Sequence, residues 1–194
     1  MGKELSEMSL EELWELFPII LKEHNKEYKE WYQIEKDNLI NCIGKQNIKR
    51  LSHIGSSAVW GLISKPTVDI LLEIDEECDV HRLKNILKNA GWCLMSSNDE
   101  PMKMVFNKGY TPNGFAEKVY HLHVRYFGDH DELYFRDYLL EHGHVSHEYG
   151  QLKLSLLEKY RHNRDGYTEA KTEFVRKHTK LAREEFGDRY LPQK

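Results

Sequence analysis

The sequence predicts an α+β protein, with an α/β-type core of strands and helices followed by a C-terminal helical lobe. Segments with strand alternation and segments with helical periodicity alternate up to about residue 128. Residues 130–186 instead carry helical periodicity with few strand signals. A length of 194 residues corresponds to roughly one domain. We therefore expect residues 1–194 to form a single domain, with a core over about 1–128 and a helical lobe over about 130–186.

Two helices and a strand are expected at the start of the chain. Ser9 followed by Glu12 is a capping-box pattern, which predicts a short helical turn over residues 9–15. An approximate helical stripe of apolar residues predicts a longer helix over 26–43. Residues 48–54 then favour a strand, which ends at a Gly-Ser-Ser turn.

Further strands follow in the core. Strict alternation predicts a strand over residues 66–74, with one apolar face and an opposite face that carries Asp69 and Glu73. A helix is expected over 80–90, and a strand over 118–127 with His121 on its polar face. Between them, two short strands over 92–95 and 102–106 are joined by a polar turn, 96–101. Helical patterns then cover 131–141, 145–162 and 166–185.

Charge and composition exclude several classes of protein. The chain has 28 Lys and Arg against 32 Asp and Glu, so it carries no global basic field that would attract nucleic acid. No apolar stretch approaches the ~20 residues that span a bilayer, and the polar N-terminus is unlike a secretory signal. The three cysteines lack metal-site spacing and are expected to be reduced thiols. We therefore expect a cytoplasmic protein whose partner is a small molecule, with no nucleic acid and no membrane.

Residues 53–57, with the sequence HIGSS, have the order that phosphate-binding chemistry requires. A Gly-Ser turn after a strand leaves backbone N–H groups free to hold phosphate oxygens. Asp69, on the next strand, offers a carboxylate to a divalent metal that bridges those phosphates. We therefore predict phosphate binding by Gly55, Ser56 and Ser57, and catalytic roles for Asp69 and Ser56. The turn is expected at the end of a central strand, with its N–H groups facing a cleft.

The run HIGSSAVWGLISKPTVDILLEI resembles the signature of the GrpB family, in which a similar HIGST-GL-KP-ID pattern occurs. Downstream, HLHV, FRDYLLEH, EYGQLKLSL and GYTEAKTEFV fit in the family's order, so the resemblance covers roughly residues 14–185. The family is similar by fold to the nucleotidyltransferase superfamily. The resemblance implies a single GrpB-like domain with a nucleotidyltransferase-like mixed β-sheet flanked by helices. It implies much less about the reaction, for which the similarity to the superfamily suggests a nucleotide-binding transferase. The family's own activity is poorly defined.

One position departs from the superfamily pattern, which places two carboxylates two residues apart on the strand. Asp69 is the first, but the second position holds Leu71. Glu73 is on the same face but ~13 Å along the strand, which is too far for one ion with metal–oxygen bonds of about 2 Å. Either the protein binds a metal differently, or it has lost metal-dependent transfer.

His121 and His123 offer a substitute for the missing carboxylate. Their imidazoles point to one face of a strand, ~6.6 Å apart along the backbone. Together with Asp69 they make a set of metal ligands that suits Mn or Zn better than Mg, and His53 is a candidate fourth member. The alternative is that these histidines hydrogen-bond in a polar cleft or face water. In the metal-binding case, the three side chains converge on one side of the sheet.

The helical lobe supplies candidates for binding a triphosphate. Tyr149 with Lys153, and Tyr167 with Lys171, are spaced by four residues and share a helix face. The pairs also match the family's EY-x-x-LK and Y-x-x-x-K motifs, and we expect all four side chains to face the core. Two further candidates for phosphate binding come from the core, namely Lys65 and Arg125.

These residues leave three functions open. The preferred one is an enzyme that transfers a nucleotidyl or phosphoryl group from a nucleoside triphosphate to a small acceptor, because the cleft residues are retained. A second is a nucleotide- or phosphometabolite-binding module without catalysis, which needs no second carboxylate. A third is a metal-dependent enzyme that uses Asp69, His121 and His123.

Overall fold

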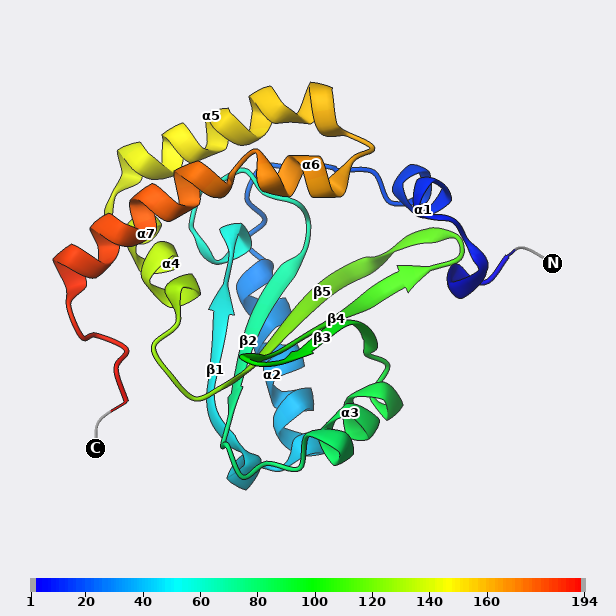
Figure 1. The fold of residues 1–194 in the computed structure, drawn as a ribbon. Helices are drawn as coiled ribbons and strands as arrows, with labels where there is room; N and C mark the ends of the chain where they lie inside the picture. The colour runs from blue at the N-terminus through cyan, green and yellow to red at the C-terminus, as the bar shows by residue number, and fades with distance from the viewer. Residues whose placement is uncertain (1–2, 193–194) are drawn as a thin grey trace.

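The sheet is the framework on which the site is built. A computed structural model describes residues 3–192, in which five strands form one mixed sheet in the order β1-β2-β5-β4-β3 (Figure 1). The strands are β1 (Ile48–Ile54), β2 (Val68–Ile74), β3 (Cys93–Asp99), β4 (Met102–Thr111) and β5 (Gly114–Tyr126). β2 and β5 are parallel, whereas the other neighbours are antiparallel. The mixed sheet confirms the predicted fold class.

The register between β2 and β5 decides which polar residues meet. Asp69 lies opposite His121, and Leu71 lies opposite His123. On the other side of β2, Asp69 pairs with Ile54 at the end of β1. The Gly-Ser turn that follows Ile54 is therefore placed beside Asp69. The prediction of a central strand before this turn was wrong, because β1 lies at the sheet edge and pairs with β2 alone.

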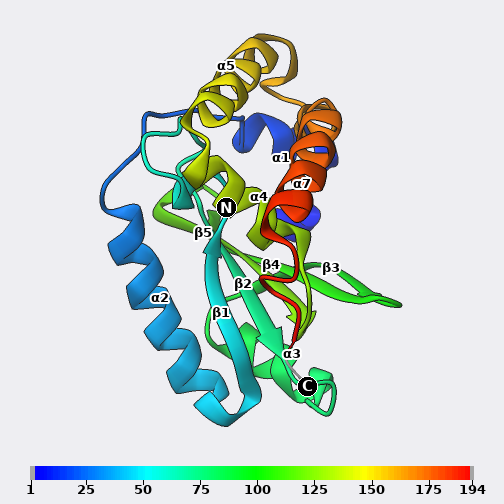
Figure 2. The ribbon, with the colours of Figure 1, turned by 90° about the vertical axis from the view of Figure 1, so that its left-hand side faces the viewer.

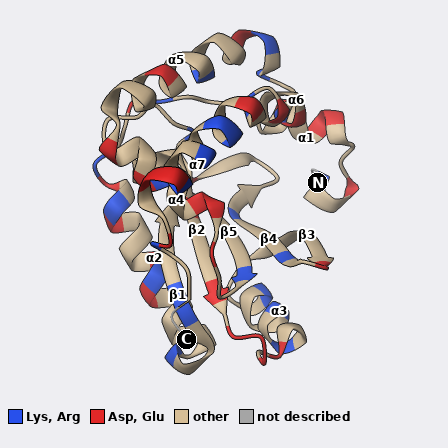
Figure 3. Cartoon of the chain, turned by 60° about the vertical axis from the view of Figure 1, so that its left-hand side comes forward, with Lys and Arg blue, Asp and Glu red and all other residues tan. Residues whose placement is uncertain are grey.

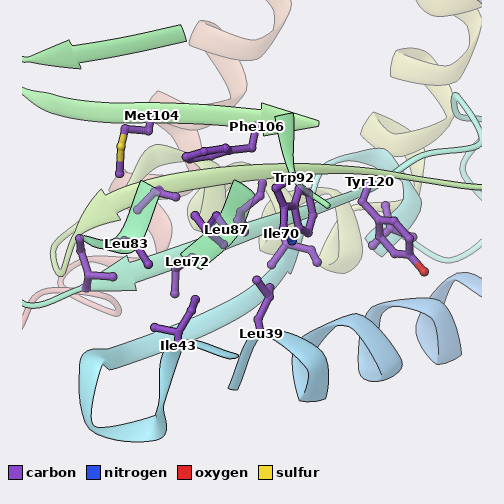
Figure 4. Packing of buried hydrophobic residues seen from close by; sticks show 14 of the residues in the cluster. Leu39, Ile43, Ile70, Leu72, Leu83, Leu87, Trp92, Met104, Phe106 and Tyr120 are labelled. Atoms are coloured by element: carbon purple, nitrogen blue, oxygen red, sulfur yellow. The ribbon is translucent and has the colours of Figure 1, made fainter. Parts of the chain in front are cut away.

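One face of the sheet is covered by α2 (Tyr28–Ile43) and α3 (Val80–Asn89). Figure 4 shows how side chains from both helices meet the apolar faces of β2 and β4. This cluster is almost fully buried, and its labelled members are Leu39, Ile43, Ile70, Leu72, Leu83, Leu87, Trp92, Met104, Phe106 and Tyr120. Burying one such aliphatic side chain contributes about 1.5–3 kcal/mol. Because the apolar positions of β2 are used here, Asp69 is left on the opposite face.

The helical lobe covers the opposite side and one end of the sheet. It consists of α4 (Asp131–Glu141), α5 (Gly143–Tyr160), α6 (Arg164–Glu169) and α7 (Thr172–Phe186). Figure 1 shows α5, α6 and α7 side by side across one end of the sheet, and Figure 2 shows α2 along the side away from α4 and α7. The helix predicted over 166–185 is two helices, and Lys171 is the N-cap of the second.

The remaining elements are short. The helix α1 (Leu10–Leu16) begins with the predicted capping box, in which the Glu12 amide donates to Ser9 Oγ over 3.2 Å. Short 3₁₀ turns occur at η1 (Leu5–Glu7), η2 (Lys45–Asn47) and η3 (Ser56–Ala58).

The β3–β4 hairpin is longer than the sequence predicts. The polar run expected as a turn over 96–101 is mostly strand, and only Glu100 and Pro101 separate β3 from β4. Every residue of β3 is exposed, so polar side chains are accommodated there without a burial cost. The polar residues that favour a turn in the sequence therefore belong mostly to a solvent-exposed edge strand.

A buried ion pair ties the core to the helical lobe. Glu73 on β2 is fully buried, and Arg50 Nη2 donates to Glu73 Oε1 over 2.7 Å and to the Gly128 carbonyl over 2.8 Å. The Gly128 amide donates to Glu73 over 3.2 Å. Glu73 is thus a structural carboxylate that fixes the connection between β5 and α4.

Charges of both signs are distributed over the sheet and the helices (Figure 3). Within the described part of the chain, no helix has both the length and the apolar character that crossing a membrane requires.

Candidate functional site

The Gly-Ser turn lies directly against Asp69. Gly55 has a φ of 71°, a conformation that residues with a Cβ rarely adopt. A Cβ placed on Gly55 would lie 2.5 Å from Asp69 Oδ2. Glycine is therefore required both for the turn and for the close approach of the backbone to the carboxylate.

Asp69, His121 and His123 converge on one side of the sheet, as the alternation of β2 and β5 predicts. Asp69 Oδ1 is 3.0 Å from His121 Nδ1 and 3.8 Å from His123 Nε2. Burial opposes ionisation of Asp69, but the hydrogen bond from His121 and the nearby imidazole of His123 outweigh it and hold the pKa of the carboxyl well below its usual range. Asp69 is therefore a carboxylate at neutral pH.

His121 lies in a chain of hydrogen bonds that fixes its tautomer. Burial lowers the pKa of His121, so the imidazole is neutral at neutral pH. A neutral imidazole has one donor and one acceptor nitrogen. Because Nδ1 donates to Asp69, Nε2 accepts from the Tyr110 hydroxyl over 2.8 Å. Asp69 orients His121, and within this series of hydrogen bonds His121 is the group that can accept a further proton.

His53 has other partners. Its Nε2 is 3.0 Å from Ser57 Oγ, and its ring stacks on Tyr32 at 5.0 Å between centroids. Burial lowers the pKa of His53 to about 4, so it is neutral. The structure engages His53 in holding Ser57 and does not bring it into hydrogen-bonding contact with Asp69.

The donor set does not fit a two-carboxylate magnesium site. Leu71, at the position of the missing carboxylate, is fully buried against Ile54 and Leu133. Glu73 is committed to Arg50. Over residues 3–192, no group of three or more His, Cys, Asp or Glu side chains is arranged to hold a metal ion. One carboxylate remains, and His121 is hydrogen-bonded to it.

Lys153 reaches from the helical lobe to the Gly-Ser turn. Its Nζ donates to Ser56 Oγ over 3.0 Å and also to the Ile63 carbonyl, and it lies 4.7 Å from the centre of the Tyr149 ring. Lys153 and Tyr149 are 3% and 6% exposed. Burial, together with repulsion from nearby lysines, lowers the pKa of Lys153 to about 7. The prediction that this pair faces the core is confirmed.

Lys171 and Lys65 complete a group of three lysines. Lys171 Nζ lies 4.2 Å from the centre of the Tyr167 ring, and this ring is buried. Burial and repulsion from Lys65 lower the pKa of Lys171 to about 7. Burial and repulsion from Arg164 lower the pKa of Lys65 to about 8, and Asp69 opposes the shift. Lys65, Lys153 and Lys171 are the three lysines for which the sequence analysis predicts phosphate binding.

Arg164 and Tyr110 belong to the site but carry no sequence signal. The Arg164 guanidinium lies 5.5 Å from the centre of the Tyr110 ring, and both residues line a small cavity with Lys65. Regular alternation would place Tyr110 on the same face as the core residue Phe106. A register shift between Lys108 and Tyr110 sends it to the face of His121 instead. Hydrophobic alternation does not reveal such a bulge.

The cations of this group have no acidic partner. Among the described residues, no carboxylate lies within 4.0 Å of the charged nitrogens of these four side chains, Lys65, Lys153, Arg164 and Lys171. We call them the cation cluster. Arg125 is not part of it. Its guanidinium donates to the Val124 carbonyl over 2.9 Å and lies 3.5 Å from Glu132. Arg125 is two residues farther along β5 than His123, and this position takes its side chain to Glu132.

An open hollow continues from the cation cluster along α7. Its volume is about 770 Å³, and Tyr149 and Lys171 stand in its wall. The other wall residues are mostly of polar types, but they expose mainly their apolar portions to the hollow; they are Asp131, Thr168, Thr172, Val175, Arg176, Thr179, Lys180, Arg183 and Glu184. A ligand at the cluster therefore has space for a larger, uncharged part beside Lys171.

Comparison with known proteins identifies relatives over most of the chain. A family model described as GrpB protein matches residues 18–181. The glutamate-rich protein GrpB of Alkalihalophilus pseudofirmus is 37% identical over 161 residues, which are 81% of this chain and 91% of that protein. A UPF0157 protein of Pseudomonas aeruginosa is 36% identical over 64% of this chain and 52% of its own length. The crystal structure of the conserved protein GrpB from Enterococcus faecalis has a TM-score of 0.72 and 26% identity, and it covers 86% of this chain and 99% of that one.

Proposed function

This chain belongs to the GrpB family, and on that premise we propose that its cleft binds the polyphosphate of a nucleotide or of a similar phosphorylated metabolite. The observation that carries this proposal is the cation cluster. Four cationic groups from three separate segments gather around Asp69 and the Gly-Ser turn, and among residues 3–192 no carboxylate lies within 4.0 Å of their charged nitrogens, so the single charge of Asp69 is left to balance them. Buried charges are normally paired, so the cluster favours an anionic ligand with several charges.

The electrostatics of the lysines support a phosphate ligand. Burial and mutual repulsion disfavour the charged forms of Lys153 and Lys171 in the free protein. A phosphate group between them would replace this repulsion with charge-assisted hydrogen bonds. Ser56 Oγ accepts its hydrogen bond from Lys153 and keeps its own proton to donate to a phosphate oxygen. The hollow along α7 then offers room for the nucleoside or its equivalent.

Transfer of a nucleotidyl or phosphoryl group is the second candidate function, and the pairing of Asp69 with His121 favours it. The acceptor hydroxyl would give its proton to the Tyr110 oxygen, and the Tyr110 proton would pass to His121 Nε2, while the acceptor oxygen bonds to phosphorus and the bond to the leaving phosphate breaks. Asp69 would stabilise the imidazolium that results, and Lys153 would offset charge on the phosphate. Leu71 favours binding without transfer, because it replaces the carboxylate that the superfamily uses.

Binding is tested by thermal stabilisation and calorimetry with ATP and with inorganic triphosphate. We expect both to stabilise the protein, since a ligand that binds the native state alone raises its stability. Lys153→Met and Lys171→Met should each lower the affinity by about 10- to 100-fold, because each removes a charge-assisted hydrogen bond. Both variants should also be at least as stable as the wild type without ligand, because each removes a cation without an ion-pair partner, buried at Lys153 and half-buried at Lys171.

Lys159→Met is the matched control. Lys159 is on the same helix as Lys153 and also lies over a tyrosine ring, at 5.0 Å, but it is exposed. Its substitution should leave the affinity unchanged. Unchanged affinity in Lys153→Met and Lys171→Met, with a loss of stability, would assign these lysines a structural role and remove the proposal. Release of pyrophosphate or ADP by the wild type, and not by Asp69→Asn, would favour transfer over binding alone.

The affinity is expected to depend on pH. Lys153 and Lys171 have pKa values of about 7 in the free protein, so they are charged below pH 7 and neutral above it. A phosphate group that is esterified at one oxygen has a second pKa of about 6, so a terminal phosphate of this kind is ionised over most of the range above pH 7. The affinity for ATP should therefore fall between pH 7 and 9, by about tenfold per pH unit for each lysine that must take up a proton. Calorimetric titrations across this range measure the slope, and an affinity that is flat to pH 9 contradicts it.

A further inference from the structure

Within residues 3–192, no second carboxylate stands beside Asp69 at the cation cluster. Polyphosphates are usually bound as magnesium complexes, in which protein carboxylates hold the ion and the ion holds the phosphates. We infer that this site takes its polyphosphate without magnesium, with Lys65, Lys153, Lys171 and Arg164 in the place of the ion. This inference rests on the proposed function and specifies the ligand as the metal-free polyanion.

The site leaves no adequate ligand set for magnesium. The ion prefers six oxygens at about 2.0–2.1 Å and is usually anchored by one or two carboxylates. Asp69 Oδ1 is occupied by His121 at 3.0 Å, and Asp69 Oδ2 lies against Gly55. Leu71 fills the second position with a buried aliphatic side chain. An ion at Asp69 would therefore have to break the hydrogen bond to His121 without gaining a second anchor.

The charges around Asp69 also oppose a divalent cation. The positive charges of Lys65, Lys153 and Lys171 repel neighbouring cations, and each of the three lysines is attracted to the carboxylate of Asp69. Adding a divalent ion to this group would increase the repulsion that already disfavours the charged lysines. A free polyphosphate has the opposite effect, because it neutralises several cations at once.

The four cations are placed where they can neutralise a phosphate chain, which is the role of the magnesium ion in other polyphosphate sites. Lys153 is hydrogen-bonded to Ser56 in the Gly-Ser turn, and Arg164 packs on Tyr110, which is bonded to His121. Cations therefore stand on both sides of Asp69. A phosphate chain held between them is neutralised by side chains that the fold already fixes in place.

The inference is tested by calorimetric titration of inorganic triphosphate and of ATP into the full chain, once with EDTA and once with magnesium in excess. We expect full affinity in EDTA. Magnesium should weaken the binding of both by at least about tenfold, because it removes the free polyanion from solution. Binding that needs magnesium, or that magnesium strengthens, overturns the inference and leaves the proposed function standing. An absence of binding under both conditions overturns both.

Asp69→Asn provides an independent test. If magnesium is held at Asp69, the variant loses affinity in the presence of the metal. If the ligand binds without metal, removing this negative charge keeps the affinity for triphosphate in EDTA or raises it. Retained far-ultraviolet circular dichroism and a cooperative melt verify the fold. Should Asp69→Asn not fold, Lys171→Met serves instead: its loss of affinity in EDTA should not be restored by magnesium, and restoration would contradict the inference.

Discussion

Gly55→Ala is expected to destabilise the protein by at least about 2 kcal/mol and to abolish triphosphate binding. The added Cβ would strain the backbone at a φ of 71° and would lie 2.5 Å from Asp69 Oδ2. Asp69 has little freedom to yield, because it is hydrogen-bonded to His121. Urea unfolding measures the loss of stability, and calorimetry measures the loss of binding.

Gly61→Ala is the matched control for this substitution. Gly61 has almost the same φ, 74°, but a Cβ there would have no neighbour within 4 Å. The control reports the backbone strain alone, which costs on the order of 1 kcal/mol. The difference between the two variants measures the contact with Asp69. Equal losses of stability in both would show that the close approach of Gly55 to Asp69 is of no consequence.

Arg50→Ala is expected to cost about 3–5 kcal/mol of unfolding free energy, because it leaves the carboxylate of Glu73 buried and unpaired. Glu73 is fully buried, and without Arg50 the polar partners of its carboxylate among residues 3–192 would be the Gly128 amide and His130. Denaturant unfolding monitored by tryptophan fluorescence measures the effect.

Two further variants separate this ion pair from surface electrostatics. Lys49→Ala removes an ion pair with Asp75 in which both side chains are well exposed, and it should cost less than about 1 kcal/mol. The double variant Arg50→Met with Glu73→Leu should regain most of the lost stability, because no uncompensated charge remains. A double variant as unstable as Arg50→Ala would mean that packing of Arg50, which also lies 5.0 Å from the Phe127 ring centre, accounts for the effect.

The alternation of apolar and polar residues was enough to predict the centre of the site. It placed Asp69 and His121 on the polar faces of two strands. The parallel register of β2 and β5 then brings these residues together. The spacing of four residues likewise predicted that Lys153 and Tyr149 share the buried face of α5.

Other parts of the site depend on long-range geometry. Tyr110 reaches His121 through a bulge that leaves no periodic signal in the sequence. Arg164, at the start of α6, acquires its place by lying over the Tyr110 ring of β4. The position of β1 at the edge also follows from which strands pair, which the local sequence does not specify.

The contact between Lys153 and Ser56 joins residues that are 97 positions apart in the chain. Another link between the lobes, from Arg136 to the His53 carbonyl, spans 83 positions. Closing loops of this length carries an entropic cost that only the completed fold can offset. The cluster of lysines therefore cannot exist in a nascent chain that ends before α5, nor in a partly unfolded state in which the helical lobe has detached. The proposed ligand site is thus a property of the finished molecule alone.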